Sequence, residues 1–293
     1  MIDLQQGFAQ AQQALQSGDF TRCSQLLEEL IQAYPDQPAF YHLSGLALKK
    51  QGNPSAARAA FERGLAINGA VPGLHAERGS ILADEGRAED AIAAYDRALQ
   101  LSPDLLDAQI DRAVVRHKHL DPQAGYRELE RVAAGNSDNP RILLNLALMA
   151  RKLGKLEESR ERVEQLLTLT PDNATGLRLR AQLAFDRGEA AIELFEIARR
   201  ASPTNHATLA GLAAALSAEG RQAEGESILR DQLAIEPDWH EGHHLLAEMQ
   251  WQAGAGEAFI DSYREALAQR PEDTVLWSDM IVATARALGH DHA

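Results

Sequence analysis

The fold of this chain is decided by residues 70–103, which read AVPGLHAERGSILADEGRAEDAIAAYDRALQLSP. Gly86 divides the stretch into two segments rich in helix-forming residues, and Pro103 ends the second segment. Glycine readily adopts the left-handed conformation that ends a helix. Proline lacks an N–H and clashes with the preceding turn, so it stops the next helix. The stretch therefore predicts a helix, a tight turn, a second helix and a second turn.

The same punctuation recurs along the chain with a period of 34 residues. The prolines are Pro35, Pro103, Pro171, Pro203, Pro237 and Pro271, and the glycines are Gly18, Gly52, Gly86, Gly154, Gly188, Gly220 and Gly254. All spacings are multiples of 34, except for one interval of 32 in each series. A two-residue deletion between Gly188 and Pro203, in the turn between two helices, explains both exceptions. An Asp follows several of the prolines, and we expect it to cap the next helix.

Packing residues fill the positions between these turns. The second repeat has Tyr41, Gly45, Leu48, Ala57 and Phe61; the third has Gly79, Leu82, Ala91, Tyr95, Ala98 and Pro103; the sixth has Ala181, Ala184, Ala191, Phe195, Ala198 and Pro203. This pattern of small residues and aromatics resembles the tetratricopeptide repeat. The resemblance weakens in the fourth repeat, where Arg112 and Arg116 stand at positions that are usually apolar.

The resemblance implies an all-α fold, a right-handed α-solenoid (superhelix) of helix-turn-helix repeats. We expect a single tetratricopeptide array over residues 1–293, with about eight repeats over 4–273 and a terminal helix over 274–288. The first helix carries glutamines on its outer side and suits a polar end cap. The last helix is apolar around most of its circumference, so we expect other residues to pack against several of its sides. The chain continues in nature, or a partner or second copy packs here, or the helix is an apolar cap; these alternatives stay open.

Composition restricts the function. The formal net charge is −14, which disfavours nucleic acid as a partner. Cys23 is the single cysteine, so no internal disulfide forms, and its slot predicts a place in the core. The first residues do not resemble a signal peptide, and no apolar stretch is long enough to cross a membrane. We expect a soluble, cytoplasmic protein with no cofactor.

One short motif has the appearance of a metal site. His240-Glu241-Gly242-His243-His244 matches the pattern that binds catalytic zinc on a helix. The motif also lies in repeat register, where it opens the first helix of the eighth repeat. We therefore expect an ordinary repeat helix with no metal and no catalytic residues, so this chain is not predicted to be an enzyme. Zinc-dependent catalysis at His240 and His244 is the alternative, left open.

In the tetratricopeptide family the first helices line the concave side of the superhelix. Positive and apolar residues gather at the corresponding positions in the middle repeats, and we expect the partner-binding residues to be Arg116, Arg141, Leu144, Leu148, Arg151, Arg178, Gln182 and Phe185. Arginine pairs carboxylates through two hydrogen bonds, so this strip suits an acidic peptide. The alternative, left open, is that these arginines pair with acids of adjacent helices.

Two functions follow from these features. The first is a protein–protein interaction scaffold that binds a partner peptide or protein in the concave groove. The second is the N-terminal, substrate-recruiting part of a longer enzyme, because the family's arrays precede glycosyltransferase, sulfotransferase and 2-oxoglutarate-dependent oxygenase domains. In that case the catalytic domain lies outside this chain.

Overall fold

The computed structural model describes residues 3–254 and 259–287, and the regular structure within them is α-helical, with no strand. Contacts divide the chain into two compact units, residues 1–153 and 154–293. The first unit contains α1 (Leu4–Gln16), α2 (Phe20–Ala33), α3 (Pro38–Lys50), α4 (Pro54–Ile67), α5 (Pro72–Asp84), α6 (Ala88–Leu101), α7 (Leu106–His119), α8 (Pro122–Ala133) and α9 (Pro140–Lys152). The second contains α10 (Leu156–Leu169), α11 (Ala174–Asp186), α12 (Ile192–Ala201), α13 (His206–Ala218), α14 (Gln222–Ile235), α15 (His240–Gln252), α16 (Asp261–Gln269) and α17 (Thr274–Ala287).

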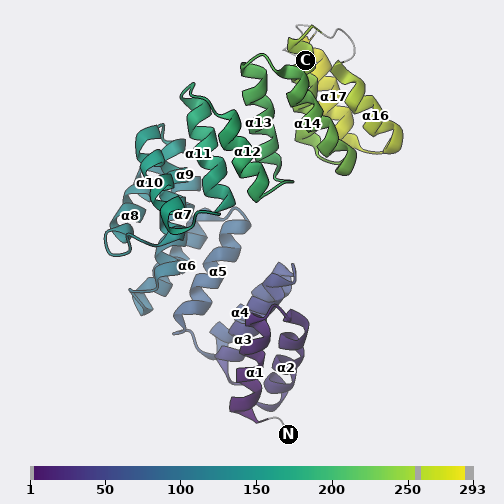
Figure 1. Ribbon diagram of the computed structural model, residues 1–293. Coiled ribbons are helices and arrows are strands. Elements are labelled where there is room, and N and C mark those ends of the chain that lie inside the picture. The colour runs from purple at the N-terminus through teal and green to yellow at the C-terminus, as the bar shows by residue number, and fades with distance from the viewer. Residues whose placement is uncertain (1–2, 255–258, 288–293) are drawn as a thin grey trace. The chain divides into compact units, whose positions relative to one another are not determined.

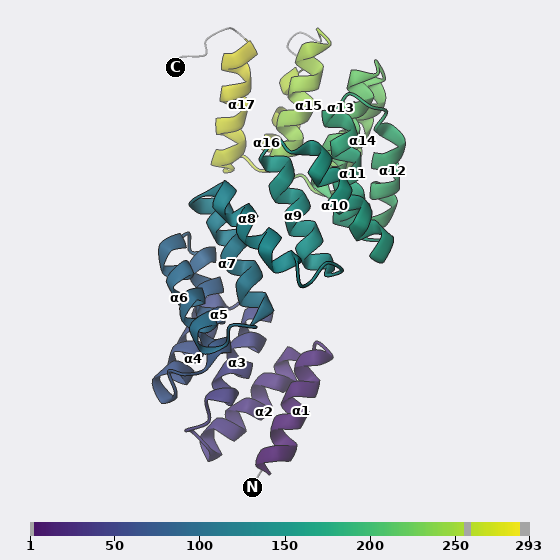
Figure 2. The same ribbon diagram turned by 90° about the vertical axis from the view of Figure 1, so that its left-hand side faces the viewer.

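Each unit is a stack of antiparallel helix pairs (Figures 1 and 2). In the first unit α1 packs on α2, α3 on α4, α5 on α6 and α7 on α8, and each pair also contacts the next. The pairs of the second unit are α11 with α12, α13 with α14 and α15 with α16. The predicted all-α solenoid of helix-turn-helix repeats is confirmed within each unit. The single array over 1–293 stays a prediction, and Leu288 lies outside the described residues.

No helix in the described ranges is both long and apolar enough to cross a lipid bilayer.

The seven glycines of the 34-residue series end the first helices as predicted. All seven have positive φ, between 71° and 79°, and no other residue type has positive φ in the described part of the chain. A Cβ added at any of them would meet nothing within 4 Å. The backbone conformation, rather than space, therefore requires glycine at these turns.

The two-residue deletion shortens a helix. Intact second helices such as α6 and α10 have 14 residues and begin two residues after their glycine. In the shortened repeat α12 has 10 residues and begins at Ile192, four residues after Gly188. The sequence placed the deletion in the turn, whereas the structure shows that the first turn of the helix is lost with it. Because α12 still ends two residues before Pro203, its packing register is preserved.

The predicted helix caps are wrong by one position. The Asp after each proline was expected to cap, but α3, α7 and α15 have no side-chain cap. Where a first helix is capped, the cap comes from the second residue after the proline position. Asn173 and Asn205 accept hydrogen bonds from the N–H groups of Gly176 and Thr208 at the starts of α11 and α13.

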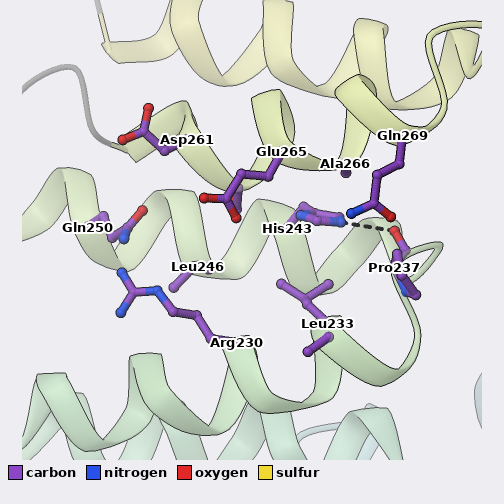
Figure 3. A pocket seen from close by; sticks show the side chains of 12 residues that line it. Arg230, Leu233, Pro237, His243, Leu246, Gln250, Asp261, Glu265, Ala266 and Gln269 are labelled. Atoms are coloured by element: carbon purple, nitrogen blue, oxygen red, sulfur yellow. Dashed lines mark hydrogen bonds between the residues drawn. The ribbon is translucent and has the colours of Figure 1, made fainter.

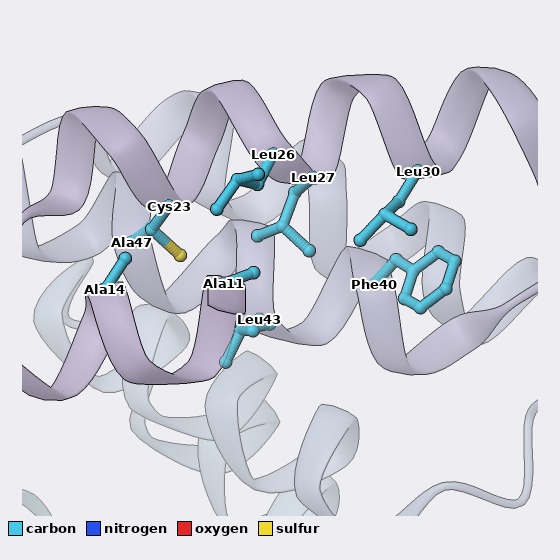
Figure 4. Close-up of a cluster of buried hydrophobic side chains, with 9 residues drawn as sticks. All are labelled: Ala11, Ala14, Cys23, Leu26, Leu27, Leu30, Phe40, Leu43 and Ala47. Atoms are coloured by element: carbon cyan, nitrogen blue, oxygen red, sulfur yellow. The ribbon is translucent and has the colours of Figure 1, made fainter. Parts of the chain in front are cut away.

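Small residues and aromatics fill the core as the repeat pattern predicts. A Cβ on Gly79 would lie 2.9 Å from Cε1 of Tyr95, so glycine lets α5 approach the aromatic ring of α6. At the N-terminal end, Cys23 is fully buried among Ala11, Leu27 and Ala47, which confirms its core position (Figure 4). Burial, followed by the charge of Asp19, raises the pKa of its thiol.

The fourth repeat departs from the pattern through a partly buried ion cluster. Nε of Arg112 donates to Oε1 of Glu128 at 2.6 Å, and Nη1 of Arg116 donates to the other carboxylate oxygen. Arg112 also donates to Asp96 of α6 at 2.5 Å. The Glu128 side chain is only 6% exposed, so the two guanidinium groups are its main compensation for lost hydration. This cluster replaces the apolar contacts that neighbouring repeats make here.

We expect Gly86→Ala to destabilise the first unit by about 1–2 kcal/mol, because the alanine must adopt a left-handed conformation. Gly135→Ala is the matched control, since Gly135 also has open space around its α-carbon but no positive φ. The control is expected to keep or slightly raise stability by narrowing the unfolded ensemble. Urea unfolding followed by circular dichroism measures both, and equal losses would contradict the conformational explanation.

Glu128→Ala is expected to destabilise the first unit by about 3 kcal/mol, because two guanidinium groups lose their shared carboxylate. The triple variant Arg112→Leu, Arg116→Leu, Glu128→Ile carries the side chains that the seventh repeat holds at Leu212, Leu216 and Ile228. We expect this triple variant to unfold at the same or a higher urea concentration than the natural chain. A larger decrease in the free energy of unfolding for the triple variant than for Glu128→Ala would contradict the explanation that the cost of Glu128→Ala comes from unpaired guanidinium groups.

Candidate protein-binding surface

The first helices of the pairs in the first unit present a network of charged side chains, here called the first-helix face: Lys49, Glu77, Ser80, Asp107, Asp111 and Arg141. Nζ of Lys49 on α3 donates to Oε2 of Glu77 at 3.1 Å and to Oγ of Ser80 at 2.7 Å, both on α5. These contacts join the first helices of two successive repeats. The face is therefore ordered by pairs of opposite charge.

Arg141 makes the same kind of link between α9 and α7. Its Nη1 donates to Oδ1 of Asp107 at 2.6 Å, and its Nη2 donates to Oδ1 of Asp111. The Arg141 side chain is 44% exposed and that of Asp107 is 78% exposed, whereas Asp111 is half-buried. The alternative that the arginines pair with acids of adjacent helices is therefore correct for Arg141, although water still reaches its guanidinium group.

Tyr95 lies beneath these charges. Burial, followed by the nearby carboxylates of Asp111 and Glu77, raises the pKa of its hydroxyl far above the ordinary value. Burial also raises the pKa of Asp111, while the charge of Arg141 acts in the opposite direction. The groups below the exposed side chains are thus largely removed from water, and their pKa values depend on the neighbouring charges.

Three further predicted residues lie on α9. Leu148 is 38% exposed, and Leu144 and Arg151 are half-buried. Leu148 stands one helical turn from Leu144 and two turns from Arg141, so these side chains share one side of the helix. Arg141, Leu144 and Leu148 therefore lie on one side of α9, and their role in binding stays a prediction.

Arg116 does not join them. It contacts Glu128 of α8, a second helix, whereas Asp107 and Asp111 on the same helix contact α9. Sequence reasoning placed Arg116 with Arg141 because both belong to first helices. The acids that pair with Arg141 lie about one repeat before it in the sequence, at Asp107 and Asp111, whereas Glu128 lies 12 residues after Arg116.

The remaining predicted residues belong to the second unit, and its position relative to the first is not determined. They lie on α11, where Arg178 and Phe185 are half-buried and Phe185 packs against the cluster around Phe195. Nε2 of Gln182 donates to Oδ1 of Asp186 at 2.8 Å. These three side chains form a surface of their own.

The zinc-like motif lies on α15 without the surroundings of a metal centre. His240 is 3.9 Å from Asp273 and 4.0 Å from Asp279, while Nε2 of His243 contacts the carbonyl oxygen of Pro237 at 3.0 Å. Residues 3–254 and 259–287 contain no group of three or more side chains that could hold a metal ion together. The C-terminal residues His290 and His292 lie outside the described residues.

The last helix exposes several apolar side chains. Val275, Trp277, Ile281 and Val282 of α17 are all exposed, although Leu276 is fully buried against the preceding repeat. The sequence predicted apolar residues around most of this helix, and the structure shows them in contact with water. Self-association through this helix stays a prediction.

The repeats of this chain match models of a known family. A tetratricopeptide repeat family model matches residues 8–73, 42–105, 111–174 and 144–206, and a second tetratricopeptide model matches 183–249. Cellulose synthase operon protein C of Xanthomonas axonopodis pv. citri (strain 306) is 29% identical over 196 residues. That alignment covers 63% of this chain but 13% of the longer relative.

Solved structures show the same fold at low sequence identity. A tetratricopeptide repeat protein from Parabacteroides merdae has a TM-score of 0.66 at 16% identity, with 84% of this chain and 98% of that chain covered. The Cut9–Hcn1 hetero-tetramer of the APC/C has a TM-score of 0.72 at 15% identity, covering 82% and 48%. The repeat length, the glycine turns and the family models agree, and the chain belongs to the tetratricopeptide repeat family.

Proposed function

We propose that this chain is a protein-interaction scaffold that holds an acidic partner segment on the first-helix face, with α9 as the main contact. The family supports the general role of a protein-interaction scaffold. The observation that favours α9 is that the accessible Arg141 guanidinium and the exposed Leu148 side chain lie on the same side of this helix. Arginine beside exposed apolar residues is typical of binding surfaces. The proposal assigns no catalytic step to this chain.

Partner exchange at Arg141 makes acidic binding compatible with the ion pairs. Asp107 is mostly exposed, and exposed ion pairs contribute only about 0–1 kcal/mol. A carboxylate of the partner can therefore replace Asp107 at Nη1 while the half-buried Asp111 keeps Nη2 in place. Arg141 is then held in orientation by one acid and offers its remaining donors to the partner.

Leu144 and Leu148 supply the apolar part of the contact. Covering an exposed leucine side chain removes apolar surface from water, which favours binding by about 25 cal/mol per Å². In the second unit, Phe185 and Gln182 on α11 offer an aromatic ring and an amide for a further contact. A partner of mixed acidic and apolar composition meets both kinds of side chain.

Arg141→Gln is expected to weaken binding of a fluorescein-labelled peptide of alternating glutamate and leucine about tenfold, through loss of a charge-assisted hydrogen bond. Asp107→Asn is expected to strengthen the same binding, since it removes the competing carboxylate. Leu148→Ser should weaken it without changing its salt dependence. Fluorescence anisotropy at two salt concentrations measures all three.

Arg116→Gln is the control, because Arg116 faces Glu128 rather than the first-helix face. It should lower the stability of the first unit and leave peptide binding unchanged. Equal effects of Arg141→Gln and Arg116→Gln on binding, or no effect of Asp107→Asn, would contradict the proposed site.

A second candidate function is the partner-recruiting segment of a longer protein. It is favoured by the exposed apolar side of α17, which suits cover by a further helix, and by the much greater length of the curated relative. The open reading frame around this sequence tests the candidate. We expect it to continue for several hundred codons beyond Ala293, and a stop codon directly after Ala293 would contradict it.

A further inference from the structure

A cavity of about 540 Å³ lies in the second unit between α14, α15 and α16. Figure 3 shows it from close by, with Arg230 and Leu233 from α14, His243 and Gln250 from α15, and Glu265 from α16. It is formed by the second helices of the seventh and eighth repeats and the first helix of the eighth. The residues that line the cavity are different from those of the surface proposed above.

Several polar atoms around this cavity have no hydrogen-bond partner in the described part of the chain. They include Oε1 of Gln250, Nδ1 of His243 and Oγ of Ser262, and all three residues line the cavity. Gln250 is 8% exposed and His243 is 3% exposed. A buried hydrogen-bond acceptor without a donor destabilises the folded state. Three such polar atoms around one cavity therefore suggest that a ligand supplies their hydrogen bonds.

His243 can be assigned as an acceptor. Its Nε2 lies 3.0 Å from the carbonyl oxygen of Pro237, which can only accept, so Nε2 carries the hydrogen. Burial is the main cause of a lowered pKa for His243, and this keeps the ring neutral at physiological pH. Nδ1 is then a bare acceptor. Gln250, through its oxygen, and His243 both lack a donor.

Comparison with the other repeats shows that the polar residues are particular to this one. The position of Gln250 is apolar in most repeats, as Ala14, Leu48, Leu82, Ala150, Ala184 and Leu216. The fourth repeat is the exception and has Arg116 there, paired with Glu128, which stands at the position of Ser262. In that repeat the arginine and the carboxylate satisfy each other's hydrogen bonds within the chain. The eighth repeat has Gln250 in place of this arginine and Ser262 in place of this glutamate.

The rim of the cavity carries two carboxylates and one guanidinium group. Asp261 and Glu265 of α16 are exposed, and Asp261 contacts Arg264 of its own helix at 3.0 Å. Arg230 lies on the opposite side, where its Nη2 is 3.1 Å from Glu226. The exposed carboxylates attract a cation, and the buried acceptors lack a donor.

We propose that this cavity binds an arginine side chain of a partner protein, which pairs with the polar groups of the cavity as Arg116 pairs with Glu128 on the wall of the equivalent groove of the fourth repeat. The guanidinium group has five N–H donors in a planar arrangement. They can satisfy Gln250 and Ser262 while the charge lies near Glu265. A ligand that only accepts hydrogen bonds would leave the buried acceptors unpaired.

The probe is a fluorescein-labelled peptide of alternating glycine and arginine, compared with the same peptide in which citrulline replaces arginine. Citrulline keeps the shape of the side chain but not its charge. Fluorescence anisotropy at 150 mM salt, on the whole chain, is expected to show roughly tenfold tighter binding of the arginine peptide.

Two variants separate the cavity from general attraction to an acidic protein. Gln250→Leu leaves the net charge unchanged and restores the residue of the seventh repeat, so it should weaken arginine binding at least fivefold and raise the melting temperature. The double variant Gln250→Arg, Ser262→Glu builds the ion pair of the fourth repeat into the cavity. It should fold, as shown by circular dichroism, and lose the preference for arginine over citrulline.

Equal binding of the two peptides would overturn the proposal, and so would unchanged arginine binding in both variants. A lower melting temperature of Gln250→Leu would show that the Gln250 oxygen is satisfied in the free protein, which also contradicts it. Binding of the glutamate–leucine peptide to α9 is expected to be unaffected by these variants. The two proposals can therefore fail separately.

Discussion

A pair of short helices cannot bury its apolar side alone, and each pair in this chain depends on the next one for cover. That dependence explains why repeat length is so regular. Successive pairs stack only if their packing residues return to the same side, and the glycine turns with positive φ fix where the first helix ends. Where two residues are missing, the chain gives up the first turn of α12 and keeps the register of the residues that pack.

The same stacking explains how polar side chains acquire specific roles. Most repeats place apolar residues between adjacent pairs, so a polar residue in that position must find a partner or remain unsatisfied. The fourth repeat has such a partner within the first unit, because Arg116 and Glu128 pair in its ion cluster. The eighth repeat has Gln250 and Ser262 at the matching positions, and their oxygens are unpaired among the described residues. The polar side chains of the fourth-repeat groove thus pair with one another, whereas those oxygens in the eighth-repeat groove are without a partner in the described part of the chain.

The repeat pattern predicted most of the fold because it depends on local requirements. The left-handed turn at Gly86 and the burial of Cys23 both follow from position within the repeat. The caps were misplaced because Asp172 and Asn173 are adjacent and equally good capping residues, and only backbone geometry decides between them. The predicted site was harder. The sequence shows that Arg116 and Arg141 both belong to first helices. The acidic residue that each arginine contacts depends on the side of the helix from which its side chain extends.

The central claim is that a partner segment lies on the first-helix face, with α9 as its main contact. Hydrogen–deuterium exchange of the whole chain, with and without the saturating glutamate–leucine peptide, tests it most directly. We expect slower exchange in α9 and in the facing helix α7, with little change in second helices such as α6 and α8. Slower exchange confined to second helices, with α7 and α9 unchanged, would contradict the claim.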